Sequence, residues 1–430
     1  MTQTTQQDIE ETLRSTPIAT SANTPTITPT ITPSIVLMSN ELEFCLDNVQ
    51  ASTILENNTT LALTPEVNQR DVVELNVSLH RSVQSLNEGL DTEVNKLREL
   101  TERHGGALYG GSSLLASVRD LEPQWYRTTS LSTACAKNLL NITSQQFIIG
   151  VRDEQAGFAL YNFFRTIGPI LVALSASSPF SYEEKTGSLR DTGFASRRMP
   201  QYAKVGTHLP QSMWYHTPQL HSLAEYELAR SNTSSEIIRL ANEGLLDANW
   251  PELTKTRQNS NGKYQYWPFT LLEPHQLYWS VRIRPDHRRE QDHCPFSIEI
   301  RMADIPTTIQ RMQMLNSVVF GAAQAITQGS HTDFPLQGSY EELFSAARSG
   351  FETRIRGTAL REYASCLVEL ARKGLEHETT QLSRLDFADR VIAQGNDAMI
   401  IREQGYKTAA QLREYLIARL RYGEYPSSEL

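Results

Sequence analysis

Charged and apolar side chains alternate in three short segments of this chain. Residues 41–44 read Glu-Leu-Glu-Phe, residues 72–75 read Val-Val-Glu-Leu, and residues 299–304 read Glu-Ile-Arg-Met-Ala-Asp. Because successive side chains of a β-strand point to opposite faces, each segment is predicted to be a strand with its acids on one face. The pattern alone leaves two interpretations open. Amphipathic strands with solvated charges are the commoner case, and a face that binds cations such as Mg²⁺ is the other.

The rest of the pattern predicts further strands and several long helices. Apolar residues recur every three or four positions over residues 79–104, with Ser78 as N-cap and a Gly-Gly pair at the end. Residues 154–175 are apolar on nearly every side, so this helix is expected to be buried, with a kink at its internal Gly-Pro. Other strands are predicted at 35–46, 107–109, 146–151, 277–285 and 297–302, other helices at 305–327 and from about 338 to the end, and a long loop at 178–218.

The composition is that of a folded protein with an unstructured leader. Hydrophobic residues make up 39% and charged residues 21% of the 430 positions, so a sizeable core is expected. Residues 1–34 are rich in Thr, Ser, Gln and Pro, and repeated prolines interrupt both helix and sheet hydrogen bonding. We therefore predict a disordered leader at 1–34 and a single large domain at 35–430.

Charge, cysteines and hydropathy limit the expected partners. The net charge of −9 and the lack of a basic stripe argue against nucleic acid. The four cysteines lie far apart without a Cys-x-x-Cys, which favours free thiols in a reducing cytoplasm. The longest apolar run, residues 167–174, is too short to cross a membrane, and the N-terminus does not read as a signal peptide, so no membrane partner is expected.

Taken in their order along the chain, short motifs resemble the glutamate–cysteine ligase type 2 family, also called carboxylate–amine ligases. Residues 41–44 are similar to the family's opening Glu-x-Glu-Phe strand, and the segment around Glu74 is similar to its second acidic strand. The string Leu-Ser-Ala-Ser-Ser-Pro-Phe at 174–180 is nearly the family's own, and Thr-Gly-Phe-Ala-Ser-Arg-Arg at 192–198 resembles its Thr-Gly-Tyr-x-Ser-x-Arg. Trp279, Arg284-Pro285 and the Glu-x-Arg at 299–301 complete a resemblance that covers roughly residues 35–420.

The resemblance implies a fold and a reaction. The fold would be α/β of the α+β kind: a glutamine synthetase-like curved antiparallel sheet with flanking helices and a helical C-terminal region. The reaction would depend on ATP and Mg²⁺: a carboxylate, that of a glutamate-like amino acid, becomes an acyl phosphate, and an amine displaces the phosphate to form an amide. The partners would be small-molecule amino acid and amine substrates. Homo-oligomers are left open, because large relatives of this fold often associate.

The resemblance also implies roles for individual residues. The candidate ligands of Mg²⁺ are Glu41, Glu43, Glu74 and Glu299, with Glu66 as a weaker fifth. Catalytic roles fall to Arg301 and Arg198, and ATP binding to Arg284, Arg198 and Gln146.

Each of these arginines has a plain salt bridge as its alternative role. Arg198 is placed on a loop at 181–212 that is expected to be mobile and to close over the nucleotide. Arg197 is expected to be solvated, and Asp304 has a second possible role as the cap of the helix that follows it.

One departure from the family bears on whether the chain is an enzyme. Where the family has His-x-His-Val-Gly, this chain has Gln146, Ile148 and Gly150 in the corresponding places, and an isoleucine cannot bind a metal. Two hypotheses therefore stay open. The chain is a ligase in which fewer protein groups hold one cation, or it is a catalytically silent relative that binds a nucleotide or an amino acid or acts as a scaffold. A zinc site at residues 287–294 is not expected, because the spacing of its His, Asp and Cys residues matches no standard finger.

Overall fold

A computed structural model describes residues 35–64, 71–111, 115, 142–183, 185–198, 200–201, 218–242, 280–285, 296–330 and 332–424 of the chain. The predictions for the leader, for Glu66 and for the cluster at 287–294 lie outside these residues. Of the expected lid at 181–212, residues 184, 199 and 202–212 also lie outside them.

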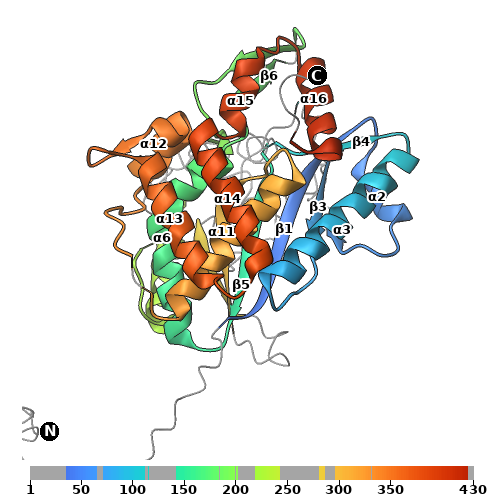
Figure 1. Ribbon diagram of the computed structural model, residues 1–430. Helices are drawn as coiled ribbons and strands as arrows, with labels where there is room; N and C mark the ends of the chain where they lie inside the picture. Colours follow the sequence, from blue (N-terminus) through green and yellow to red (C-terminus); the bar gives the residue numbers. More distant parts are fainter. Residues whose placement is uncertain are drawn as a thin grey trace, which may run out of the picture. The chain divides into compact units, whose positions relative to one another are not determined.

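Seven strands of the described residues form one antiparallel sheet (Figure 1). Their order is β2 (Leu63–Thr64), β3 (Val72–Asn76), β1 (Ile35–Asp47), β5 (Ser144–Val151), β9 (Phe296–Asp304) and β8 (Val281–Pro285), and β4 (Ala107–Tyr109) also pairs with β1. The antiparallel sheet that the motifs implied is thus confirmed, and two neighbouring strands at its centre, β1 and β5, carry Glu43 and Gln146.

One face of this sheet is apolar because every second strand residue is apolar. Leu42, Phe44, Phe147, Ile149 and Ile300 are fully buried in the core. Burying an apolar side chain of this size contributes about 1.5–3 kcal/mol. Three helices pack over this face: α3 (Val83–Arg103), α6 (Glu154–Ser175) and α11 (Ile309–Thr327).

The helix predicted at 154–175 is α6, which lies deep in the core. Its N-cap Asp153 accepts a hydrogen bond from Ala156 N at 2.7 Å, and Pro169 lies inside it. A Cβ atom at Gly168 would lie 2.8 Å from Met302 Sδ of β9, so glycine permits the close contact between helix and sheet.

The length of α6 corrects the expectation that no segment of the chain is long and apolar enough to cross a membrane. By length and composition this helix of 22 residues is able to cross a membrane, although the apolar run read from the sequence is shorter. The core helix of a soluble protein meets the same criteria, and 72% of the most apolar window of α6 is buried inside the protein.

The helix predicted at 79–104 begins later than expected. The N-cap of α3 is Ser82 rather than Ser78, and Ser82 Oγ accepts a hydrogen bond from Ser85 N at 3.1 Å. The cause is tertiary, because His80 exchanges two backbone hydrogen bonds with Met38 of β1, at 2.8 and 2.9 Å. This pairing keeps the segment before Ser82 out of the helix.

The C-terminal part is helical, as predicted. Its helices are α12 (Tyr340–Ser349), α13 (Leu360–Gly374), α14 (Thr379–Gln394), α15 (Asp397–Gln404) and α16 (Ala409–Tyr422). A short 3₁₀ helix, η3 (Gly350–Glu352), and a hairpin of β10 (Arg354–Ile355) and β11 (Thr358–Ala359) separate α12 from α13.

Several elements of the described residues were not predicted. They are α2 (Ala51–Asn57), α9 (Leu223–Asn242), a hairpin of β6 (Phe180–Glu183) with β7 (Ser188–Asp191), and the short elements β2, η3, β10 and β11. The hairpin lies within the stretch expected to be a loop, so that expectation is wrong for its two strands, residues 180–183 and 188–191.

Candidate active site

The sheet gathers the predicted acids on the face opposite to the core helices. Glu43 lies directly opposite Glu74, and Glu299 lies directly opposite Ile148. Opposed residues of an antiparallel pair share a face, as do residues two apart on one strand. Glu41, two residues before Glu43, therefore joins them. We call this surface the acid face; its residues are Glu41, Glu43, Glu74, Gln146, Ile148, Arg282, Glu299 and Arg301.

Glu43 is buried at the middle of the acid face. Its Oε2 accepts a hydrogen bond from Ser144 Oγ at 2.9 Å, and its Oε1 accepts one from Gln146 Nε2 at 3.1 Å. Burial raises the pKa of Glu43 and the Glu74 carboxylate raises it further, whereas Arg198 lowers it. A cation placed between Glu43 and Glu74 would offset both the burial and the repulsion.

Gln146, which the sequence analysis assigned to ATP binding, contributes a hydrogen-bond acceptor beside Glu43. Its buried Oε1 has no hydrogen-bond partner among the described residues. A buried polar atom without a partner costs about 1–3 kcal/mol, so a bound cation or donor would stabilise it. Carboxylate and amide oxygens are ligands of Mg²⁺, and the donor set of Glu43, Glu74 and Gln146 therefore fits this ion.

The described ranges hold no group of three or more His, Cys, Asp or Glu side chains already gathered as a metal site. The assignment of Glu41, Glu43, Glu74 and Glu299 to Mg²⁺ therefore stays a prediction.

Glu299 is fully buried between two arginines. Its Oε2 lies 2.6 Å from Arg282 Nε, and its Oε1 contacts Arg301 Nη1. Arg301 thus forms the salt bridge that the sequence analysis gave as its alternative role. Arg282, which lies opposite Glu299 in β8, was missed by the sequence analysis. The alternation of Val281, Arg282 and Ile283 carried the signal for it.

Two further predicted positions complete the description of the acid face. Ile148, where the family has a histidine, is buried between Ser39 of β1 and Glu299 of β9. Arg284 belongs to β8, but its side chain lies outside the described part of the structure, so its role in ATP binding stays a prediction.

Asp304 joins the two most family-like motifs. Its Oδ2 accepts hydrogen bonds from Ser177 N at 3.1 Å and Ser178 Oγ at 2.9 Å, and its Oδ1 accepts one from Ser196 Oγ at 2.8 Å. Burial raises the pKa of Asp304 to about 6, although these three donors lower it. The suggestion that Asp304 caps the following helix is wrong, because Thr308 caps α11.

The segment that carries Arg197 and Arg198 is fixed to the sheet. Ser178 Oγ accepts a hydrogen bond from Arg197 N at 2.8 Å, and Arg198 Nε donates one to Arg301 O at 2.9 Å. Both arginines are buried, so the expectation that Arg197 is solvated is wrong. Burial lowers the pKa of Arg197 to about 10, although the Asp304 carboxylate raises it. Arg198 therefore belongs to the rigid frame of the site.

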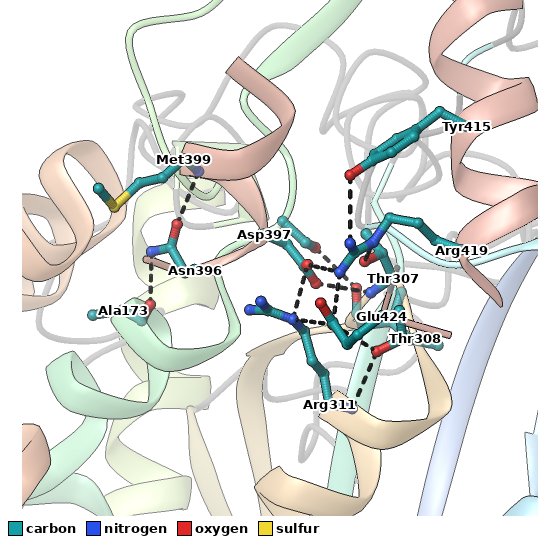
Figure 2. A network of polar contacts seen from close by, with 12 residues as sticks. Ala173, Thr307, Thr308, Arg311, Asn396, Asp397, Met399, Tyr415, Arg419 and Glu424 are labelled. Carbon is teal, nitrogen blue, oxygen red and sulfur yellow. Dashed lines mark hydrogen bonds and ion pairs between the residues drawn. The ribbon is translucent and has the colours of Figure 1, made fainter. Parts of the chain in front are cut away.

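A second polar network ties the chain just after β9 to the C-terminal helices (Figure 2). Thr307 N donates to Asp397 Oδ2 at 2.9 Å, and Arg419 bonds to Thr307 Oγ1 at 2.8 Å and to Asp397 Oδ1 at 3.1 Å. Glu424 Oε1 lies 2.6 Å from Arg311 Nε and 2.7 Å from Arg419 Nη2. Arg419 of α16 and Glu424 just after this helix thus support the strand end that carries Asp304.

A family model described as glutamate–cysteine ligase family 2 matches residues 46–419. A search of curated proteins found no match. Among solved structures, the glutamate–cysteine ligase of Francisella tularensis in complex with AMP is similar, with a TM-score of 0.59, 13% identity, and coverage of 92% of this chain and 91% of that chain.

Two more distant structures were also found. A bifunctional glutathione synthetase from Pasteurella multocida has a TM-score of 0.45 and 12% identity over 90% of this chain and 53% of that chain. The complex between the prokaryotic ubiquitin-like protein Pup and its ligase PafA gives a TM-score of 0.41 and 11% identity over 86% of this chain and 68% of that chain.

Proposed function

The chain belongs to glutamate–cysteine ligase family 2, as its motifs indicated, and from that premise we propose that it is an ATP- and Mg²⁺-dependent ligase. It would join the carboxylate of a glutamate-like amino acid to an amine. The observation that carries this proposal is the acid face, where acids and arginines are buried together on neighbouring strands. Burying charge is unfavourable unless a partner compensates it. A cation and a phosphate are partners of the required signs.

The proposed reaction has two steps. A substrate carboxylate oxygen forms a bond to the γ-phosphorus of ATP, and ADP leaves with the electron pair of the broken P–O bond. The amine nitrogen then attacks the acyl carbon, phosphate leaves, and the nitrogen loses a proton to give the amide. Mg²⁺, when bound, neutralises negative charge on the phosphate oxygens.

The residues of the acid face would divide this work between cation and phosphate. Glu43 and Glu74 would hold the cation together with Glu41, because their repulsion decreases when it binds. Arg198 and Arg301 would contact the transferred phosphoryl group. Since both are held by the protein before substrate arrives, little reorganisation is needed in the transition state.

Glu299 stays a candidate metal ligand, but its two ion pairs favour a different role. A carboxylate bonded to both Arg282 and Arg301 orients these guanidinium groups. We propose that Glu299 positions Arg301 for phosphate.

A second candidate function is that of a silent relative that binds a nucleotide or an amino acid. Two observations favour it: the apolar Ile148 in the centre of the acid face, and the engagement of Glu299 by arginines. The Francisella ligase was crystallised with AMP, and we propose an adenine nucleotide as the ligand in either case.

ADP release, measured with pairs of amino acids and amines at fixed Mg²⁺, tests the ligase. We expect release that depends on both substrates and falls by about 10²-fold or more when the cation site is disrupted by Glu43→Gln with Glu74→Gln. Glu56→Gln, which changes an exposed acid of α2, is the matched control and should keep wild-type activity. If the protein binds a nucleotide but releases no ADP with any substrate pair, the ligase proposal is wrong and the silent relative takes its place.

A further inference from the structure

A polar cavity of about 620 Å³ lies on the helix side of the sheet, away from the acid face. Its walls are one face of α3 and one face of α14, its floor is the first turns of α11, and the end of α16 closes one side. Pockets that hold small molecules commonly measure about 300–1,000 Å³, so the space suits a small metabolite. α11 packs against both α3 and α14, and in Figure 1 α3 lies to the right of the other two helices.

Five charged side chains line the cavity, and two of them, Arg384 and Asp91, make no close polar contact with the residues described. Of the other three, Arg98 and Arg421 form ion pairs with Glu102, and Glu88 accepts a hydrogen bond from Gln84. Arg384 of α14 is half-buried, and burial lowers its pKa, although the charge of Asp91 across the cavity raises it. Neither side chain has a hydrogen bond or an ion pair to another described residue. An arginine held partly out of water without an anion is unfavourable, so an anionic group is the expected occupant beside it.

Amides and hydroxyls make up much of the remaining lining. Gln310 contributes an Oε1 atom that is buried and has no partner among the residues described. Asn87 and Gln381 are themselves bonded to each other at 2.7 Å, so this part of the lining is fixed before any ligand binds. An acceptor at Gln310 together with a carboxylate at Asp91 suits a ligand with N–H donors.

We propose that this cavity is a binding site for a zwitterionic α-amino acid. Its carboxylate would pair with Arg384, and its ammonium group would pair with Asp91 and reach Gln310. The site lies on the opposite face of the sheet from Glu43, so it is distinct from the proposed substrate site.

Isothermal titration of the full-length protein with the common L-amino acids tests this assignment. We expect at least one free amino acid to bind, and its N-acetyl and carboxamide derivatives to bind at least about tenfold more weakly, because each lacks one charge. Arg384→Gln and Asp91→Asn should weaken binding by a similar factor. Asp91 is exposed, so its variant is expected to fold even if the arginine variant does not.

Matched controls on α3 use exposed residues outside the cavity. Lys96→Gln and Glu99→Gln should bind like the wild type. Arg301→Lys separates the two sites, because it changes the acid face only. If no amino acid binds at millimolar concentration, or if binding is unchanged in both cavity variants and lost in Arg301→Lys, the cavity is not an amino-acid site. Neither outcome depends on whether the chain releases ADP.

Discussion

Asp304 makes the stability of this protein depend on pH. Burial raises its pKa from 3.8 to about 6, so between about pH 4 and pH 6 the folded chain binds more protons than the unfolded chain. Its contribution to the unfolding free energy therefore falls as pH rises through this window, by about 3 kcal/mol in total, and stays constant above it. Asp304→Asn should remove this fall.

Urea denaturation at several values between about pH 4 and pH 7 measures this component. Asp333→Asn changes an exposed acid and should keep the wild-type pH dependence. If Asp304→Asn also keeps it, the folded Asp304 ionises in the ordinary range and its raised pKa is refuted.

Arg282 compensates the charge of a fully buried carboxylate. Arg282→Ala removes one of the two arginines that form ion pairs with Glu299, so we expect the unfolding free energy to fall by about 3–5 kcal/mol. The exposed pair of Arg361 with Glu352 gives the comparison, since Glu352→Gln should cost less than about 1 kcal/mol. If both variants lose the same unfolding free energy, burial of Glu299 does not make its ion pair with Arg282 more important for stability than an exposed one.

Ile148 lies where the family has a histidine, directly opposite Glu299. A histidine nitrogen there would add a ligand to the acid face, so Ile148→His should tighten Mg²⁺ binding by about tenfold if the proposed cation site exists. Titration with Mg²⁺ in the presence of a non-hydrolysable ATP analogue measures this change. Ile149→His places the new side chain on the opposite face of β5, toward the core, and should not tighten Mg²⁺ binding. Unchanged affinity in Ile148→His would place the cation elsewhere.

At the scale of elements, α11 is linked to the sheet by a chain of buried amides. Asn316 Oδ1 accepts from Gln145 Nε2 of β5 at 3.0 Å, and Asn316 Nδ2 donates to Asn87 Oδ1 of α3 at 3.0 Å. Asn316→Ala deprives both neighbours of a partner and should lower the unfolding free energy by about 1–3 kcal/mol or more. Gln394→Ala, at the exposed end of α14, should leave it nearly unchanged in the same denaturation experiment.

Since Gln145 precedes Gln146 in β5, the same variant reports on the acid face. If Asn316→Ala weakens nucleotide binding beyond its effect on stability, the amide chain positions Gln146. If stability is not affected, the neighbouring amides find other partners and the chain is not a structural link.

Patterns within one element were predicted well, and contacts between elements were not. The strands at β1 and β9 and the helix α6 follow from alternation and hydropathy, which depend on neighbouring residues only. The start of α3 depends on the pairing of His80 with Met38, which lies far away in the sequence. Similarly, the burial of Arg197 depends on Ser178, and no local pattern indicates that contact.

At the scale of the whole molecule, the candidate site is assembled from segments far apart in the chain. Glu43 comes from the first strand, Ser178 and Ser196 from the segments after α6, and Asp304 from β9. Only the resemblance to a family brought these motifs together from the sequence, because composition and periodicity carry no information on long-range pairing. The partners of Asp304 and the ion pairs of Glu299 became visible in the structure alone.

The C-terminal network of Figure 2 predicts that a residue distant from the acid face stabilises its frame. Glu424 accepts from two buried arginines, Arg311 and Arg419, and these lower its pKa although burial acts in the opposite direction. Its stabilisation is therefore present above the ordinary pKa of a glutamate and is lost as pH falls through the lower value in the folded state. Glu424→Gln should reduce the unfolding free energy by about 1–3 kcal/mol at neutral pH, because Asp397 alone then compensates both arginines.

The control for this change is Glu414→Gln, which removes an exposed acid from α16, the helix that ends just before Glu424. It should leave stability near the wild-type value.

Arg419 also bonds to Thr307, which follows β9 by three residues. The Glu424 variant should therefore loosen the end of β9. Hydrogen exchange of the amides at 303–308 measures that loosening. The difference in stability between Glu424→Gln and the wild type should shrink in acid, as the wild-type carboxylate is protonated. A difference that stays constant down to about pH 3 would show that the hydrogen bonds of Glu424, rather than its charge, hold the C-terminal helix in place.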